Sequence, residues 1–142
     1  MLKPSVVFEI CLDRYHLAKT LALRTPSLEE SVRNRRQRHR GQQAWNYVAD
    51  FELCGRRRLH GHPGRLELFK LYFCEATPYA DSIQILKVKH GTFDYWTQEI
   101  KREVGEELMR RGVYPPRRYF RELAATGAQR REALAACDRK TP

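Results

Sequence analysis

Apolar residues recur every three or four positions along almost the whole chain, and this spacing constrains the fold more than any other feature. Between Phe93 and Leu108, for example, the repeat passes through Thr97, Ile100 and Val104. Such a repeat places side chains on one face of an α-helix, whereas a half-buried strand requires strict alternation. The chain has no convincing alternating stretch and no hairpin signal. We therefore predict an all-α fold, a small helical domain.

Start and stop signals divide the chain into separate helices. The first helix ends before Pro26, and Ser27 with Glu30 has the form of a capping box that opens the second. Thr77 can cap a short helix, and Gly112 is a natural stop for the last one. The predicted helices cover about residues 5–23, 27–55, 63–74, 79–86 and 91–111.

Several large apolar residues are expected to form the buried faces of these helices. Trp45, Val48 and Phe51 recur at three-residue spacing and predict one apolar face on the second helix. We expect Phe93 and Trp96 to pack in the core as well. The first helix is predicted from a stripe formed by Val6 or Val7, Ile10, Arg14 or Leu17, and Leu21.

Breaks in this pattern suggest three segments. Residues 1–62 hold N-terminal helices with an Arg-rich basic stretch, residues 63–112 a helix-turn-helix domain, and residues 113–142 an extended Pro-containing segment and a C-terminal tail. Pro115 and Pro116 exclude a helix at the start of the tail. We expect this part to lie extended against the domain, with Tyr119 and Phe120 as anchors.

The chain is strongly basic, with 27 Lys and Arg against 17 Asp and Glu and a net charge of +10. An excess of this size favours a polyanionic partner, nucleic acid first. The densest cluster lies in a stretch without any acid between Ser31 and Ala49, and phosphate contact is its functional interpretation. The alternative is a solvated face or a flexible linker. The arginines of this cluster are Arg33, Arg35, Arg36, Arg38 and Arg40.

No pattern in the sequence indicates catalysis or a bound cofactor. The cysteines Cys11, Cys54, Cys74 and Cys137 are widely spaced, and no CxxC pair is present. There is no glycine-rich phosphate loop, no HExxH and no GxSxG. We therefore expect no enzyme, no metal site and no cofactor.

The first residues do not read as a signal peptide, because their apolar run is short and interrupted by acids. No apolar run approaches the roughly 20 residues of a membrane span. We expect a cytoplasmic protein without a membrane partner.

The segment 63–112 has the layout of a helix-turn-helix. A short helix of residues 79–86 is followed by a tight turn and a longer helix. In this layout one side of the second helix packs on the core while the other enters a DNA major groove. The polar residues expected to face the groove or its phosphates are Lys89, His90, Thr92, Tyr95, Gln98, Lys101 and Arg102.

At these residues the stretch "FKLYFCEATPYADSIQILKVKHGTFDYWTQEIKREVGEEL" resembles the C-terminal promoter-binding domain of bacterial RNA polymerase sigma factors, of the extracytoplasmic-function type. The resemblance covers residues 63–108. It implies a sigma-like helix-turn-helix that binds double-stranded DNA, with RNA polymerase as a second partner. The matching residues are Tyr79, Ile85, Leu86, Val88, Gly91 and Thr92, with Phe93 where the family has Val.

Some residues depart from the family pattern. Lys87 stands in place of the turn glycine, which costs about 1 kcal/mol if its φ is positive. Lys89 replaces a serine-like N-cap, and a lysine cannot accept an amide hydrogen bond. Asp94 and Glu99 put acids where the family often has basic or small polar residues. The segment before residue 63 does not resemble the polymerase-binding domain of a complete sigma factor.

We therefore expect a sequence-specific DNA-binding protein that acts in transcription control. Two alternatives remain open. The same fold could serve as an adaptor for protein partners or for DNA packaging, which Asp94 and Glu99 favour. The protein could also bind RNA through its arginine clusters.

Overall fold

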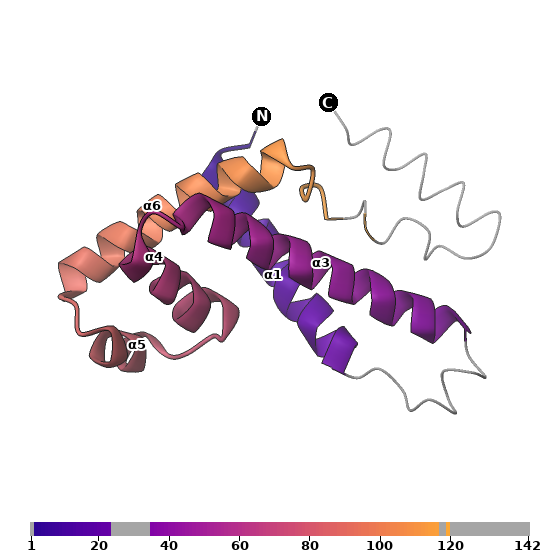
Figure 1. Cartoon of the computed structure of the whole chain (residues 1–142), viewed down its shortest axis with the longest axis horizontal. Coiled ribbons are helices and arrows are strands. Elements are labelled where there is room, and N and C mark those ends of the chain that lie inside the picture. Colours follow the sequence, from indigo (N-terminus) through magenta and orange to yellow (C-terminus); the bar gives the residue numbers. More distant parts are fainter. Residues whose placement is uncertain (1, 24–34, 117–118, 120–142) are drawn as a thin grey trace.

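The computed structural model describes residues 2–23, 35–116 and 119, and in this part of the chain every regular element is a helix (Figure 1). The prediction of a small all-α domain is therefore confirmed. In chain order the elements are α1 (Pro4–Leu23), α3 (Arg35–Leu59), α4 (Pro63–Leu68), η1 (Phe69–Cys74), α5 (Tyr79–Leu86) and α6 (His90–Arg110).

An aromatic cluster holds α1, α3 and η1 together. Phe8 meets Phe73 edge-on with ring centroids 5.0 Å apart, and Tyr15 stacks on Phe51 at 4.6 Å. Phe51 in turn stacks on Phe69 at 5.8 Å. All five rings are buried, and each contributes about 1.5–3 kcal/mol of hydrophobic stabilisation.

Helix α1 was predicted with nearly the observed bounds, but most of the stripe that indicated it lies on the solvent side. Ile10, Leu17 and Leu21 are exposed, as is Val6, whereas Val7 is buried. Small side chains such as Ala18 alternate with aromatic ones on the buried face, so this face carries a weaker periodic signal. Its members are Val7, Phe8, Cys11, Tyr15, Ala18 and Ala22.

Helix α3 differs from its prediction at two residues. Trp45 is not a core residue, since 46% of it is exposed. Tyr47 is buried instead, and its hydroxyl donates to the backbone carbonyl of Cys11 at 3.1 Å. The helix also continues through Gly55 to Leu59 instead of ending at the glycine. Gly55 is needed inside the helix because the Phe69 ring occupies the space of a Cβ.

The segment predicted as a helix over 63–74 is one, with Pro63 in its first turn, but its last part is a π-helix. The chain then turns through Ala76, whose φ is 57°. Thr77 does not cap α5 with its side chain. Its carbonyl instead accepts a hydrogen bond from the buried Ser82 hydroxyl at 3.2 Å.

Helix α6 ends where its sequence predicts. Gly112 has a φ of 73°, its amide donates to Met109, and the amide of Val113 donates to the carbonyl of Leu108 at 2.9 Å. These two bonds form a Schellman motif, which satisfies the last carbonyls of the helix. Tyr119 is an anchor as predicted: its ring packs edge-on against Tyr47 and its hydroxyl donates to Asp50 at 2.7 Å.

Several sequence-based predictions fall outside the described residues, among them the capping box of Ser27 and Glu30, Arg33 and the anchor Phe120. The division into segments 1–62, 63–112 and 113–142 stays a prediction, although the core is shared by α1, α3 and α6. Among the described helices, none has the length and apolar character that crossing a membrane requires.

Candidate nucleic-acid interface

The short helix α5, the turn 87–89 and the first half of α6 form one structural unit. Ile83 is buried below α5, and Phe93 is buried below α6. The Phe93 ring lies edge-on to Tyr72 and to Tyr79, in both cases with centroids 5.1 Å apart. This packing fixes the position of the second helix relative to the first.

The turn itself depends on Lys87. Its φ of 55° and ψ of 44° lie in the left-handed region. Lys87 stands where the resembling family has a turn glycine, and glycine favours this conformation. The amide of Lys87 donates to the carbonyl of Ile83 at 2.9 Å and closes the last turn of α5. A lysine in this conformation stores about 1–2 kcal/mol of strain relative to a glycine.

A hydrogen bond between side chains links the two helices across the turn. The Tyr79 hydroxyl on α5 donates to Asp94 on α6 at 2.9 Å, and it lies 3.4 Å from Nδ1 of His90. The bond to Asp94 raises the pKa of the Tyr79 hydroxyl. The Asp94 carboxylate therefore has a hydrogen-bond donor within the protein.

Five predicted contact residues are exposed in the first half of α6. Lys89 and His90 are exposed at the start of the helix, and Thr92, Tyr95 and Gln98 follow at three-residue spacing. We call this set of five residues the α6 face. With 3.6 residues per turn, Thr92, Tyr95 and Gln98 lie on the side of the helix away from the buried Phe93.

The two remaining predicted contacts on this helix have partners within the protein. Lys101 pairs with Glu9 of α1 at 2.9 Å, and only 22% of its side chain is exposed. Arg102 pairs with Glu99 at 2.8 Å and with Glu106 at 3.4 Å. The hydrogen bond from Arg102 lowers the pKa of Glu99. We therefore keep Lys101 and Arg102 outside the α6 face.

The N-terminus of α6 has no side-chain cap. Lys89 occupies the N-cap position without bonding the helix, as expected for a side chain that cannot accept a hydrogen bond. The first helical amide bond is from Phe93 to the carbonyl of Lys89. The preceding amides are therefore available to an anion, which the helix dipole also favours.

Tyr95 combines an exposed ring with a cation. The guanidinium of Arg65 lies over the ring, 5.7 Å from its centroid, and 58% of Tyr95 remains exposed. Arg65 also approaches Glu103 at 4.0 Å. The sequence did not connect Arg65 with this surface, because the contact joins residues thirty positions apart.

The predicted arginine cluster is only partly within the described residues. Arg33 lies outside them, and Arg35, Arg36, Arg38 and Arg40 belong to the first turns of α3, where the backbone but not the side chains is described. Phosphate contact by these residues stays a prediction.

A second basic surface lies where the last turns of α3 and α6 meet. A cleft of about 790 Å³ is lined by arginines of both helices and by His60, with Glu107 as its acidic residue. Each helix end supplies adjacent arginines, a pairing that the sequence alone did not predict because the helices are distant along the chain. The arginines lining this arginine cleft are Arg56, Arg57, Arg58, Arg110 and Arg111, with His60 beside them.

Glu107 organises one wall of the arginine cleft. The residue is 2% exposed, and it accepts hydrogen bonds from Arg111 at 2.7 Å and from Arg110 at 2.9 Å. Burial alone raises the pKa of Glu107, but the two arginine bonds outweigh it, and the pKa lies below its ordinary value of 4.5. Arg58 is directed to Glu106, with a contact of 2.6 Å.

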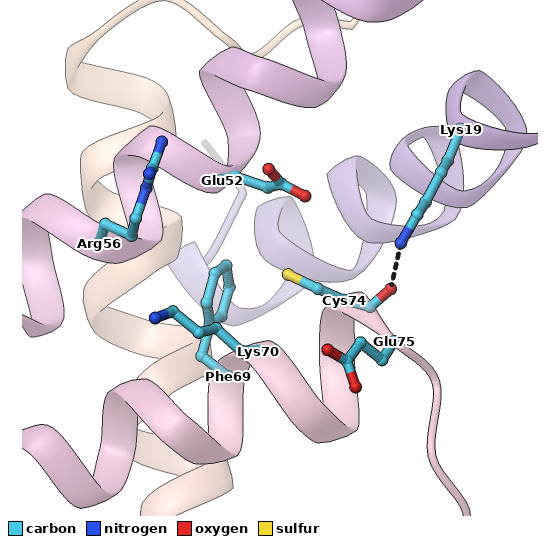
Figure 2. Close-up of a pocket in the computed structure, with 7 residues that line it drawn as sticks. All are labelled: Lys19, Glu52, Arg56, Phe69, Lys70, Cys74 and Glu75. Atoms are coloured by element: carbon cyan, nitrogen blue, oxygen red, sulfur yellow. Dashed lines mark hydrogen bonds between the residues drawn. The ribbon is translucent and has the colours of Figure 1, made fainter. Parts of the chain in front are cut away.

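A smaller pocket of about 270 Å³ lies between α1, α3 and η1 (Figure 2). Figure 2 shows Lys19 reaching across it to donate to the backbone carbonyl of Cys74 at 3.2 Å. Burial raises the pKa of the Cys74 thiol to about 12, so this thiol stays protonated and is a weak nucleophile at neutral pH. The other residues that line this pocket include both acids and bases, such as Glu52 and Arg56.

Among the described residues, no group of three or more His, Cys, Asp or Glu is arranged to hold a metal ion. Cys11, Cys54 and Cys74 are buried and unpaired with one another.

Comparison with known proteins does not assign the chain to a family. No model of a protein family matches it, and neither the curated proteins nor the solved structures yield a significant match.

Proposed function

We propose that this protein binds duplex DNA in a sequence-specific manner through α5, the turn and the first half of α6, and that it acts in transcription control. The observation that carries the proposal is the α6 face: polar residues exposed in the first half of α6, with Thr92, Tyr95 and Gln98 on the side away from the buried Phe93. Gln98 and Thr92 can exchange hydrogen bonds with base edges, and Lys89 can meet a phosphate.

The acids near this surface are compatible with DNA binding. Asp94 accepts from Tyr79 at 2.9 Å, and Glu99 is paired with Arg102 at 2.8 Å. The cation beside Glu99 offsets its repulsion of phosphates, whereas Asp94 keeps its charge but is held by a hydrogen bond to α5. The net charge of +10 adds a long-range attraction that does not depend on sequence.

A selection from random DNA duplexes tests this proposal directly. We expect one enriched sequence, and Gln98→Ala should relax the preference at one or two positions, with a loss of about 1–3 kcal/mol of discrimination at each. Gln42→Ala is the matched control, since Gln42 is an exposed glutamine of α3 that bonds Asn46. If Gln98→Ala leaves the selected sequence unchanged, α6 does not read the bases.

Salt dependence tests the electrostatic part separately. The logarithm of the association constant should fall with the logarithm of salt concentration, with a slope of roughly −0.9 per phosphate contacted. A flat slope would remove the DNA proposal and leave an adaptor for a protein partner as the better interpretation.

The arginine cleft favours RNA binding as a second candidate function. Its arginines come from two helix ends and surround a cleft of about 790 Å³, which suits flexible single strands better than a rigid duplex. A competition between duplex DNA and single-stranded RNA of equal length distinguishes the two. The DNA proposal requires the duplex to win at every salt concentration.

A further inference from the structure

The arginine cleft brings together guanidinium side chains from two helix ends that are far apart in the sequence. The last turn of α3 supplies three of them, and the end of α6 supplies two. Arg58 of α3 contacts Glu106 of α6 at 2.6 Å and ties the two ends together. Arginines therefore line one cleft of about 790 Å³ from two sides.

The arginines of the cleft differ in how much of their hydrogen-bonding capacity the fold already uses. Arg56 and Arg57 are exposed, and neither has an ion-pair or hydrogen-bond partner in the part of the chain that the structure describes. Arg111 donates to Glu107 through Nε, at 2.7 Å, so its two terminal nitrogens keep their donors. These three arginines can therefore donate to a ligand without breaking a contact of the fold.

The positive charge of the cleft exceeds what the fold itself requires. Cations near a helix C-terminus offset the negative end of the helix dipole, which is equivalent to about half an elementary charge for each helix. Glu106 and Glu107 neutralise two of the five arginines. The two helix ends and the two acids thus account for about three of the positive charges, and an excess of about two remains.

This excess favours a ligand with at least two adjacent negative charges. A single carboxylate would leave part of the excess without a partner, whereas two neighbouring phosphate groups neutralise it. The planar guanidinium also matches phosphate oxygens, because it can donate two parallel hydrogen bonds. We propose that the arginine cleft is a binding site for a run of two or more consecutive phosphate groups, which Arg56, Arg57 and Arg111 contact.

The phosphate site is separate from the α6 face. Arg110 follows Gln98 by twelve residues, which is roughly 18 Å along the helix axis. Between them α6 packs on the core through Ile100, Val104 and Leu108. Phosphate binding in the cleft therefore does not depend on base reading by α6. A free polyphosphate and the backbone of an RNA strand are two sources of the same ligand chemistry.

Isothermal titration of the full chain with inorganic tripolyphosphate tests the site. We expect tripolyphosphate to bind at least about tenfold more tightly than inorganic phosphate, because only the longer ion spans several arginines. Arg56→Gln and Arg57→Gln should each weaken tripolyphosphate binding by about five- to tenfold, with unchanged helix content by circular dichroism. Equal affinity for the two ions, or no loss in either variant, would overturn the proposal.

Lys87→Gln is the matched control. It removes one exposed positive charge at the turn before α6, at the opposite end of this helix from the cleft. Tripolyphosphate should bind this variant as tightly as it binds the wild type. A loss as large as that of Arg57→Gln would place the anion at the start of α6 or assign its binding to net charge, and the cleft proposal would fail while DNA binding by α6 could still hold.

Two further ligands identify the source of the phosphates. A uridine RNA of about ten nucleotides that binds more tightly than tripolyphosphate, with the same dependence on Arg57, assigns the cleft to an RNA backbone. Tighter binding of tripolyphosphate assigns it to a free polyphosphate. An octaglutamate peptide carries negative charge without phosphate groups and should bind at least about tenfold more weakly than tripolyphosphate. Equal binding of the peptide would show a site for any anion and overturn the proposal.

Discussion

At the scale of single residues, Glu107 is the charge on which the fold depends most directly. Its carboxylate is almost completely buried, and it is stabilised by arginines that reach it from its own helix. Such a group is favourable only while its partners are present, because burial of an unpaired carboxylate is costly. The same arrangement orients Arg110 and Arg111 at the arginine cleft.

Glu107→Gln should therefore lower the free energy of unfolding at pH 7 by about 1–3 kcal/mol, since it removes charged hydrogen bonds. The folded pKa of Glu107 lies below 4.5, so its contribution is present above that pH and disappears as the pH falls through the folded value. Urea unfolding at pH 7 and pH 3 measures this. The difference between variant and wild type should shrink at pH 3, and a constant difference would contradict the charged role of Glu107.

Gly55 provides a second residue-scale prediction. Gly55→Ala inserts a Cβ into the space of the buried Phe69 ring and should destabilise the protein by about 1–3 kcal/mol. Gly91→Ala is the control, because a Cβ there meets nothing within 4 Å and the helix should gain up to about 1 kcal/mol. Thermal unfolding of both variants should shift the melting temperature in opposite directions. A gain in both would show that the Phe69 ring moves away readily.

At the scale of elements, the helix-turn-helix combines a well-packed pair of helices with a strained turn. Phe93 and its neighbouring rings hold α5 against α6, whereas Lys87 keeps a left-handed conformation that favours glycine. The packing of the rings must therefore offset the strain at the turn.

Lys87→Gly removes this strain and should raise the free energy of unfolding by about 1 kcal/mol, after the larger entropy of the unfolded glycine is allowed for. Lys87→Ala removes the same charge but keeps the strain, so it should give no such gain. Chemical denaturation of the two variants separates charge from conformation. Equal stability of the two would show that the left-handed turn costs little.

At the scale of the whole molecule, two surfaces occupy different parts of the fold. The α6 face lies at the start of α6 and the arginine cleft at its end. Figure 1 shows α1 and α3 crossing, with α4 and α5 beyond one end of α3.

The sequence predicted the helices more accurately than the surfaces they form. Apolar spacing and turn residues located α1 and the stop at Gly112 because these signals are local. Gly55 was misjudged because its role depends on Phe69, which reaches it only in the folded chain. Trp45 was misjudged because the side of α3 that meets α1 is the one that carries Tyr47. Local pattern does not encode such contacts.

The candidate site was predicted in a similar way. Spacing on one helix was enough to predict that Tyr95 and Gln98 are exposed on the side away from Phe93. The partners of Lys101 and Asp94 lie on other elements, α1 and α5, and only the fold brings them together. The arginine cleft likewise requires two helix ends that are far apart in sequence.

The close contact of Gly105 has a mechanical consequence. A Cβ at this position would collide with the backbone of Pro4, so the main chains of α1 and α6 touch with no side chain between them. Side chains can change rotamer to absorb a displacement, whereas two touching backbones cannot. A displacement of α1 at Pro4 is therefore passed directly to the backbone of α6 at Gly105.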